Sequence, residues 1–195
     1  MFTSRMGRRF ASAFCKAYLT SPRGIAIVAV EPETDIVVGF VVGGDPQVRR
    51  QFLAGAKWRF PLRLVYRSIV DDVVRSAVLG EIKANLLPGH KGKLDKVRKV
   101  WLGEVQGEFA LLQIIAVLKR YWGTGMADRL MDVFRGVCKS RGFGTIGLTV
   151  AADNARAVAF YRKTGWQVVS ESETSLWMQL PCAEWQKYRR RAGRR

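Results

Sequence analysis

Phe109-Ala-Leu-Leu-Gln-Ile-Ile-Ala-Val-Leu118, an almost continuously apolar run, leads into the glycine turn Trp122-Gly-Thr-Gly-Met-Ala127. Such a run is typical of a strand that is buried on both faces at the middle of a sheet. Beyond the turn, apolar residues return at helical spacing, at Met126, Leu130, Val133, Phe134 and Val137. We therefore predict a strand, a short turn and a helix in direct succession.

This succession suits the binding of an anion. The backbone N–H groups of the turn can point at one ligand, and the helix that begins near Met126 adds its positive end. Gly123 and Gly125 place no Cβ between the backbone and such a ligand. A P-loop would need Lys-Ser/Thr after a second glycine at longer spacing, and the turn has neither. A dinucleotide fold would place an acidic residue about 20 positions on at a strand end, where this chain has Val150-Ala151. The turn therefore predicts an anion site, for a ligand other than a nucleoside triphosphate or NAD.

The residues after this helix predict a strand, a capped helix and a hairpin. Residues 145–150 are rich in apolar and β-branched side chains, as strands are. Asp153-Asn154 can cap a helix that runs to Thr164, and Gly165 stands where helices often stop. Two further strands are expected at residues 166–169 and 175–180, since Leu176, Met178 and Leu180 alternate.

The residues before the central strand predict a helix, a β-hairpin and a basic segment. Apolar spacing over residues 6–20 favours an amphipathic helix. Residues 25–30 and 36–42 are β-rich runs that a turn of hairpin length separates. Residues 46–101 are helical in pattern and basic, with breaks at Pro61, Pro88 and Gly89.

Together these elements predict one α+β domain of three layers over residues 1–195. The family resemblance described next implies that its centre is a mixed, mostly antiparallel, twisted sheet that helices flank. Residues 46–101 form a helical insertion before the central strand, and residues 187–195 form a disordered basic tail.

A second motif follows the glycine turn: Asn154-Ala-Arg-Ala-Val-Ala-Phe-Tyr161, and then Gly165-Trp166. Together the two motifs resemble the GNAT superfamily of acyl-CoA N-acyltransferases, over roughly residues 105–180. In that family Gln or Arg, two residues, Gly, one residue and Gly or Ala hold the pyrophosphate of coenzyme A. Arg120-Tyr-Trp-Gly-Thr-Gly125 also fits this pattern. The register Trp122 to Ala127 keeps the usual spacing, and it puts Trp122 where the family usually has Arg or Gln. The resemblance implies acetyl-CoA as co-substrate and no metal.

The resemblance also implies roles for single residues. The main chain of Ile115, Ala116 and Val117 would pair with the pantetheine arm, the strand at 145–150 would splay away, and a backbone N–H at or beside Val117 would face the thioester carbonyl oxygen. Asn154 would contact the arm, or simply cap its helix. Tyr161 would be the general acid toward the thioester sulfur, or simply pack in the core. The pyrophosphate would lie against Trp122, Gly123, Thr124, Gly125, Met126 and Ala127, with Arg120 as another source of a side-chain contact.

The sequence leaves the general base open. Members of the family that acetylate ribosomal-protein N-termini carry Glu five positions before the Asn, and that position is Thr149 here. Histone-type members carry Glu within the central strand, where this chain has Leu111 or its apolar neighbours. Glu108 is a candidate that would act through water, as is Glu104, and each could instead be a solvated charge at a strand end.

The balance of charge bears on the acceptor. The chain has 33 Lys and Arg against 16 Asp and Glu, a net charge of +17; residues 46–101 hold 13 against 4, and six of the last nine residues are basic. Such a field repels polyamines and attracts phosphate. We therefore expect an anionic amine acceptor, for instance an amino sugar linked to a nucleotide. Candidate phosphate contacts are Arg49, Arg50, Arg59, Arg63 and Arg67.

Other uses of this charge are open at this stage. A catalytically inactive protein of the same fold could bind coenzyme A, or it could bind nucleic acid through its basic segments. Aromatic and apolar residues between the arginines also suit an anionic membrane surface. These residues are Trp58, Phe60, Leu62 and Tyr66.

The remaining candidates argue for a cytoplasmic protein without a metal. Cys15, Cys138 and Cys182 are widely spaced and odd in number, which fits neither a disulfide framework nor a metal site. His90 could be a base, although its loop setting favours a solvated histidine. No run approaches the ~18 apolar residues of a membrane-spanning helix, and the basic start lacks a secretory signal.

Overall fold

The computed structural model describes residues 7–59 and 108–182, with side chains up to residue 55 in the first range. Of these, residues 7–16 and 49–59 belong to one compact unit, and residues 17–48 and 108–182 to another. The single domain over residues 1–195 stays a prediction. Several predicted features lie outside the described residues: the breaks at Pro61, Pro88 and Gly89, the residues His90, Glu104, Arg63 and Arg67, and the tail.

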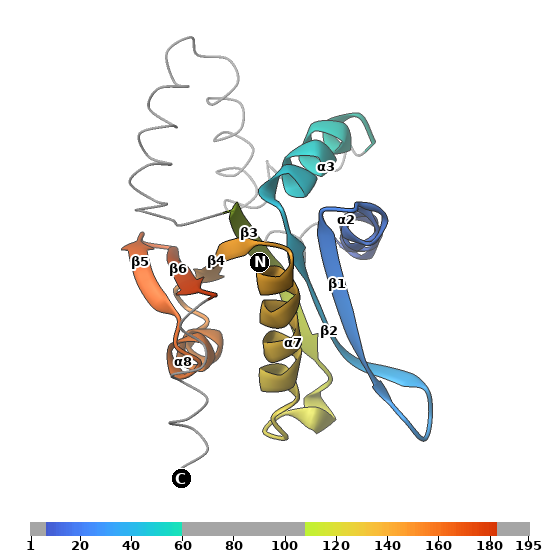
Figure 1. Cartoon of the computed structure of the whole chain (residues 1–195), viewed down its shortest axis with the longest axis vertical. Helices are drawn as coiled ribbons and strands as arrows, with labels where there is room; N and C mark the ends of the chain where they lie inside the picture. The colour runs from blue at the N-terminus through green and yellow to red at the C-terminus, as the bar shows by residue number, and fades with distance from the viewer. Residues whose placement is uncertain (1–6, 60–107, 183–195) are drawn as a thin grey trace. The chain divides into compact units, whose positions relative to one another are not determined.

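The second unit is built on a mixed six-stranded sheet (Figure 1). Only β3 and β4 are parallel, and the other four pairs are antiparallel. The sheet confirms the predicted mixed, mostly antiparallel architecture. Its order is β1 (Gly24–Glu31), β2 (Ile36–Gly44), β3 (Glu108–Val117), β4 (Phe143–Ala151), β6 (Ser175–Pro181) and β5 (Gln167–Glu171).

Two helices cover one face of this sheet. Helix α7 (Met126–Ser140) lies against β1 to β4 (Figure 1), and α8 (Ala155–Lys163) adds Val158 and Tyr161 to the same core. On this face the side chains of β4 stand opposite those of β6, which is how antiparallel strands stabilise each other. The shared core includes Leu130, Met131, Phe134 and Cys138 of α7, Ile146, Leu148 and Val150 of β4, and Leu176, Met178 and Leu180 of β6.

Glycine on β2 lets α7 approach the sheet closely. A Cβ built on Gly43 would lie 2.6 Å from Cζ of Phe134 and 2.3 Å from the carbonyl oxygen of Leu111. Any larger residue at this position would push α7 and β3 away from β2. The position of α7, and with it the glycine turn at its start, thus depends on this contact.

In the first unit, Phe10 and Phe14 of α2 (Arg8–Thr20) pack edge-on against Phe52 of α3 (Pro46–Arg59), with ring centroids 5.2 Å apart in each pair. The helix α2 confirms the amphipathic helix that the apolar spacing predicts.

At the start of α3, in the second unit, Asp45 caps the helix, since its Oδ1 accepts a hydrogen bond from the Gln47 amide at 2.7 Å.

The predicted burial of β3 on both faces is wrong in part. On β3 only Ala110 and Leu112 are buried, and the remaining residues are half-buried or exposed. The reason is that its second half has lost β4 as a neighbour, as described below. On α7, Val133 is 51% exposed, because the core-facing residues are the ones at Leu130, Met131, Phe134 and Cys138.

Candidate coenzyme A site

The two parallel strands separate half-way along. β3 and β4 pair from Glu108 and Phe143 as far as Leu111 and Gly147, and no further. β3 then continues to Val117 with β2 along its other edge. From residue 112 to 117, the edge that faces β4 carries no strand among the described residues. The main chain of Ile115, Ala116 and Val117 therefore borders a split. The N–H and C=O groups on that edge need another partner, apart from the Val117 carbonyl oxygen, which accepts from Trp122.

The glycine turn lies at the open end of this split. After β3 come a 3-10 turn at Lys119–Tyr121, the turn itself, and α7, which begins at Met126 as predicted. Gly123 and Gly125 have φ angles of 82° and 79°, which favour glycine, and nothing lies within 4 Å of a Cβ built on either. Open space next to the backbone is what a pyrophosphate requires.

Several amides of the turn are free to bind that pyrophosphate. The carbonyl oxygen of Tyr121 accepts hydrogen bonds from the amide and the hydroxyl of Thr124. The amides of Gly123, Gly125, Met126 and Ala127 have no acceptor among the residues that the structure describes. The positive end of α7 adds its field, although Asp128 in the first helical turn opposes it.

Trp122 contacts two neighbours through its side chain. Its Nε1 donates to the carbonyl oxygen of Val117 at 2.9 Å. The guanidinium carbon of Arg156, the second residue of α8, lies 3.3 Å from the centroid of its ring. Arg156 is absent from the sequence predictions. A basic residue two positions after a helix cap is unremarkable in sequence, and only the fold brings it to Trp122.

Arg120, the other basic side chain considered for the turn, is engaged elsewhere. Its Nη2 lies 3.6 Å from Oε2 of Glu31, at the end of β1. The hydroxyl of Tyr121 also donates to Glu31. Hydrogen bonds from Thr34 and Tyr121 lower the pKa of Glu31 below its ordinary value. This cluster ties the β1–β2 hairpin to the residues just before the glycine turn.

Asn154 is the cap of α8. Its Oδ1 accepts a hydrogen bond from the Ala157 amide at 3.1 Å. This is the simpler of its two predicted roles, and it leaves the Nδ2 group of the side chain available as a donor. A contact with the pantetheine arm stays a prediction.

Tyr161 belongs to the hydrophobic core and is 5% exposed. Its ring packs edge-on against Trp166, with centroids 5.5 Å apart, and its cluster includes residues from both sides of the split, Ile115 and Val117 on β3 and Leu148 and Val150 on β4. Burial raises the pKa of Tyr161 to about 12. The phenol is therefore protonated throughout the neutral range, as a proton donor must be.

Glu108 lies far from the glycine turn. It is the first residue of β3, so about 30 Å of strand separates it from Val117, and about 10 Å separates it from the point where β3 and β4 part. Glu108 lines a hollow of about 540 Å³ at that end of the sheet. Among the described side chains, none of the cations forms an ion pair with Glu108. The other lining residues are Pro22, Arg23, Asp45, Arg141 and Phe143.

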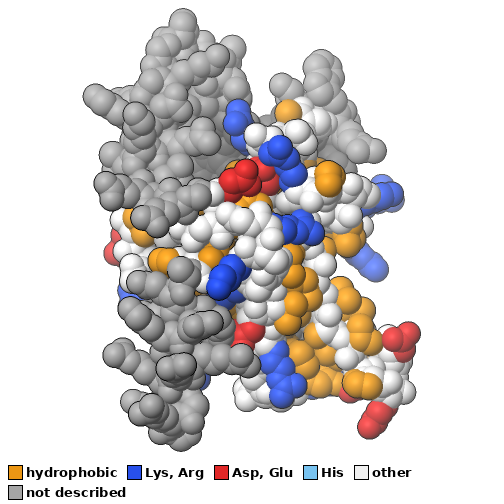
Figure 2. All heavy atoms as spheres, viewed as in Figure 1, with side chains coloured by type: hydrophobic (Ala, Val, Ile, Leu, Met, Phe, Trp, Pro, Cys, Tyr) orange, Lys and Arg blue, Asp and Glu red, His pale blue; other side chains and the backbone are white. Residues whose placement is uncertain are grey.

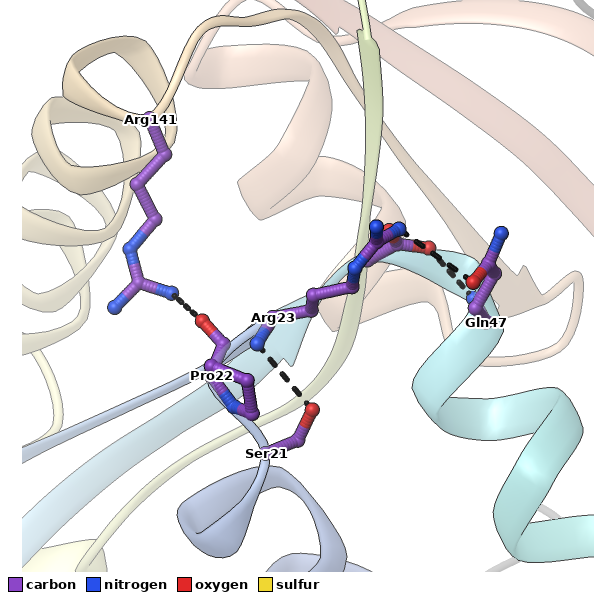
Figure 3. A network of polar contacts seen from close by, with 6 residues as sticks. Ser21, Pro22, Arg23, Gln47 and Arg141 are labelled. Atoms are coloured by element: carbon purple, nitrogen blue, oxygen red, sulfur yellow. Dashed lines mark hydrogen bonds and ion pairs between the residues drawn. The ribbon is translucent and has the colours of Figure 1, made fainter.

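The arginines of this hollow hold the chain together. Arg23 forms an ion pair with Asp45 at 2.8 Å, and its Nη1 lies 3.5 Å from Oε1 of Gln47 (Figure 3). Arg141 donates to the carbonyl oxygens of Pro22 and Gly24 at 3.2 and 2.8 Å. These contacts of the two arginines fix the start of β1 and the end of β2. Neither arginine forms an ion pair with Glu108.

The described surface shows a scattered distribution of basic side chains. In Figure 2 they lie apart from one another on the visible face, with hydrophobic side chains between them. Arg49 and Arg50 are exposed. Exposed apolar residues gather on the β1–β2 hairpin, at Val28, Val30, Ile36 and Val37. None of the described helices is long and apolar enough to cross a membrane.

Comparison with known proteins decides the family. A model of the acetyltransferase (GNAT) family matches residues 72–166. This region of the chain belongs to the GNAT superfamily. The match takes in β3, the glycine turn, α7, β4 and α8, and hence the whole of the split and its mouth.

Comparison with solved structures finds the same fold in SsHAT. The crystal structure of SsHAT has a TM-score of 0.60 at 20% identity, over 93% of this chain and 89% of that one. Nourseothricin acetyltransferase has a TM-score of 0.46 at 18% identity, over 83% and 66% of the two chains. For the ribosomal-protein-S18-alanine N-acetyltransferase of Escherichia coli the values are 0.47 and 15%, over 89% and 75%. The comparison with curated proteins found no match.

Proposed function

We propose that this GNAT protein transfers an acetyl group from acetyl-CoA to a primary amine. Membership of the family supports transfer to an amine in general. The observation that carries the choice of donor is the split between β3 and β4, which opens beside a turn with free amides and open space at Gly123 and Gly125. The pantetheine arm would pair with Ile115 to Val117, and the pyrophosphate would lie against residues 122–127.

In the reaction, the neutral amine attacks the thioester carbonyl carbon, the C–S bond breaks, and the amine loses a proton while the thiolate gains one. Tyr161 would give its proton, or a strong hydrogen bond, to the sulfur. A backbone N–H at or beside Val117 would stabilise the developing oxyanion. Because the pKa of Tyr161 is about 12 and that of a thiol about 8.5, hydrogen bonding as the sulfur acquires charge fits this phenol better than early proton transfer.

Glu108 lies about 30 Å along β3 from Val117, too far to take, through one water, the proton of an amine that attacks a thioester held there. That proton would pass to solvent, and Glu108, unpaired among the described side chains, would line the hollow about 10 Å from the parting of the strands. The acceptor would approach from this end of the sheet, and the coenzyme from the other. An anionic, phosphorylated amine, for instance an amino sugar linked to a nucleotide, suits the net charge of +17.

Release of free thiol from acetyl-CoA tests this function. The panel should contain a nucleotide-linked amino sugar, the same sugar without phosphate, spermidine and a peptide with a free N-terminus. We expect turnover, with the phosphorylated amine preferred and its advantage shrinking as salt rises. Coenzyme A binding without turnover on any amine would favour an inactive binding protein, and a preference for spermidine would contradict the anionic acceptor.

A further inference from the structure

The side chain of Trp122 provides no free hydrogen-bond donor for a phosphate at the glycine turn. Family members usually have Arg or Gln at this position, and both can donate to phosphate. Trp122 has one donor, Nε1, and this atom already donates to the carbonyl oxygen of Val117 at 2.9 Å. The side chain at position 122 thus offers a phosphate neither charge nor a free N–H group.

Arg156 brings a cation to the same place. Its guanidinium carbon lies 3.3 Å from the centroid of the Trp122 ring, so the cation rests on the electron-rich face of the indole. Stacking occupies the flat face of a guanidinium and leaves its five N–H groups pointing outward in the plane. Those groups can bind two phosphate oxygens at once.

No competing acid holds Arg156. Within the part of the chain that the structure describes, none of the carboxylates forms an ion pair with it. Arg120, the alternative cation near the turn, lies 3.6 Å from Glu31. Of these two side chains, Arg156 is the one whose charge remains available to a ligand.

The pair also joins the two sides of the split. Trp122 is fixed to the last residue of β3 by its hydrogen bond, and Arg156 belongs to the helix that follows β4. A phosphate at the free amides of Gly123 and Gly125 would therefore meet main-chain donors from one side and a guanidinium from the other.

We propose that Arg156, held in place by the ring of Trp122, is the side-chain ligand for the pyrophosphate of coenzyme A. The proposal rests on the proposed function, because it assumes that the split takes this donor. It assigns to α8 a contact that the family usually makes from the turn.

Calorimetric titration of the full chain with coenzyme A and with dephospho-coenzyme A tests the proposal. The second ligand lacks the 3′-phosphate and keeps the pyrophosphate. Arg156→Gln should weaken the binding of both ligands by about 10- to 100-fold, the size of a lost hydrogen bond to a charged group. Arg162→Gln, an exposed arginine in the last turn of the same helix, removes the same charge and should leave both affinities nearly unchanged.

Two further variants separate position from charge. Arg156→Lys should recover only part of the affinity, because an ammonium group has no planar fork. Trp122→Ala removes the platform and should weaken binding as well. Adding Arg156→Gln to Trp122→Ala should then cost little more, since the two residues act as a unit. Both side chains are exposed, so we expect the variants to fold, as circular dichroism would verify.

The possible outcomes are distinct. Wild-type affinity in Arg156→Gln, or an equal loss in Arg162→Gln, would overturn the inference and leave the proposed function standing. A loss for coenzyme A alone would place Arg156 at the 3′-phosphate and overturn its assignment to the pyrophosphate. Failure of the wild-type chain to bind either ligand would overturn the proposed function itself.

Discussion

Tyr161 is a buried phenol whose hydroxyl has no hydrogen-bond partner among the described residues. Replacement by Phe should therefore leave the fold as stable as before or slightly more so. If the hydroxyl serves the leaving sulfur, kcat should fall by about 100-fold or more, as it does for a lost general acid, while the Kd for acetyl-CoA stays the same. Steady-state kinetics with calorimetry would check this, and an unchanged kcat would show that Tyr161 only packs the core.

At this scale the sequence predicts what depends on neighbours in the chain. The start of α7 at Met126 and the cap at Asn154 follow from short patterns of glycine and asparagine, because those residues act on their own backbone. The stacking of Arg156 on Trp122 joins residues 34 positions apart, and the sequence holds no local signal for it. The engagement of Arg120 by Glu31 is equally invisible, since it depends on where the hairpin ends.

At the scale of the element, the contact between α7 and β2 sets the position of the glycine turn. Gly43→Ala would bring a methyl group against the Leu111 carbonyl oxygen and the ring of Phe134, and neither can move without shifting β3 or α7. We expect a loss of about 1–3 kcal/mol in the free energy of unfolding, measured by urea denaturation, together with weaker binding of coenzyme A.

Gly136→Ala is the matched control for that change. Gly136 is an exposed residue inside α7, and nothing lies within 4 Å of a Cβ built on it. Alanine in a helix interior should raise the free energy of unfolding by about 0.5–1 kcal/mol. Destabilisation by Gly136→Ala, or tolerance of Gly43→Ala, would contradict the packing described here.

The parting of β3 and β4 marks the limit of prediction for elements. An apolar run indicates a central strand, and the order of the sheet confirms that place for β3. The run does not reveal where the neighbouring strand leaves, because pairing in the sheet depends on residues far apart in the chain. Ile114 and Ile115 are only half-buried because β4 no longer lies beside them.

At the scale of the whole molecule, stability should fall at alkaline pH. Burial raises the pKa of Tyr161 and of the Cys138 thiol to about 12, and that of the Cys182 thiol to about 11. A raised pKa means that each group keeps its proton to a higher pH in the folded chain than in the unfolded chain. The free energy of unfolding therefore keeps its full value, as far as these three groups are concerned, below about pH 9, and it falls between pH 9 and 12.

Denaturation at a series of pH values would measure this loss. Each of the three groups should contribute about 1.4 kcal/mol per pH unit while it is ionised only in the unfolded chain. Tyr161→Phe should make the curve shallower above pH 10 by one group's share. A curve that the substitution leaves unchanged would mean that the phenol titrates alike in the folded and unfolded chains.

The central claim is that acetyl-CoA lies in the split between β3 and β4, and a crystal structure of the complex tests it most directly. The account predicts the pyrophosphate on the amides of residues 123–127, with Arg156 against it, and the pantetheine arm along Ile115 to Val117. Acetyl-CoA bound away from the split, or with its arm outside the β3 edge, would contradict the account.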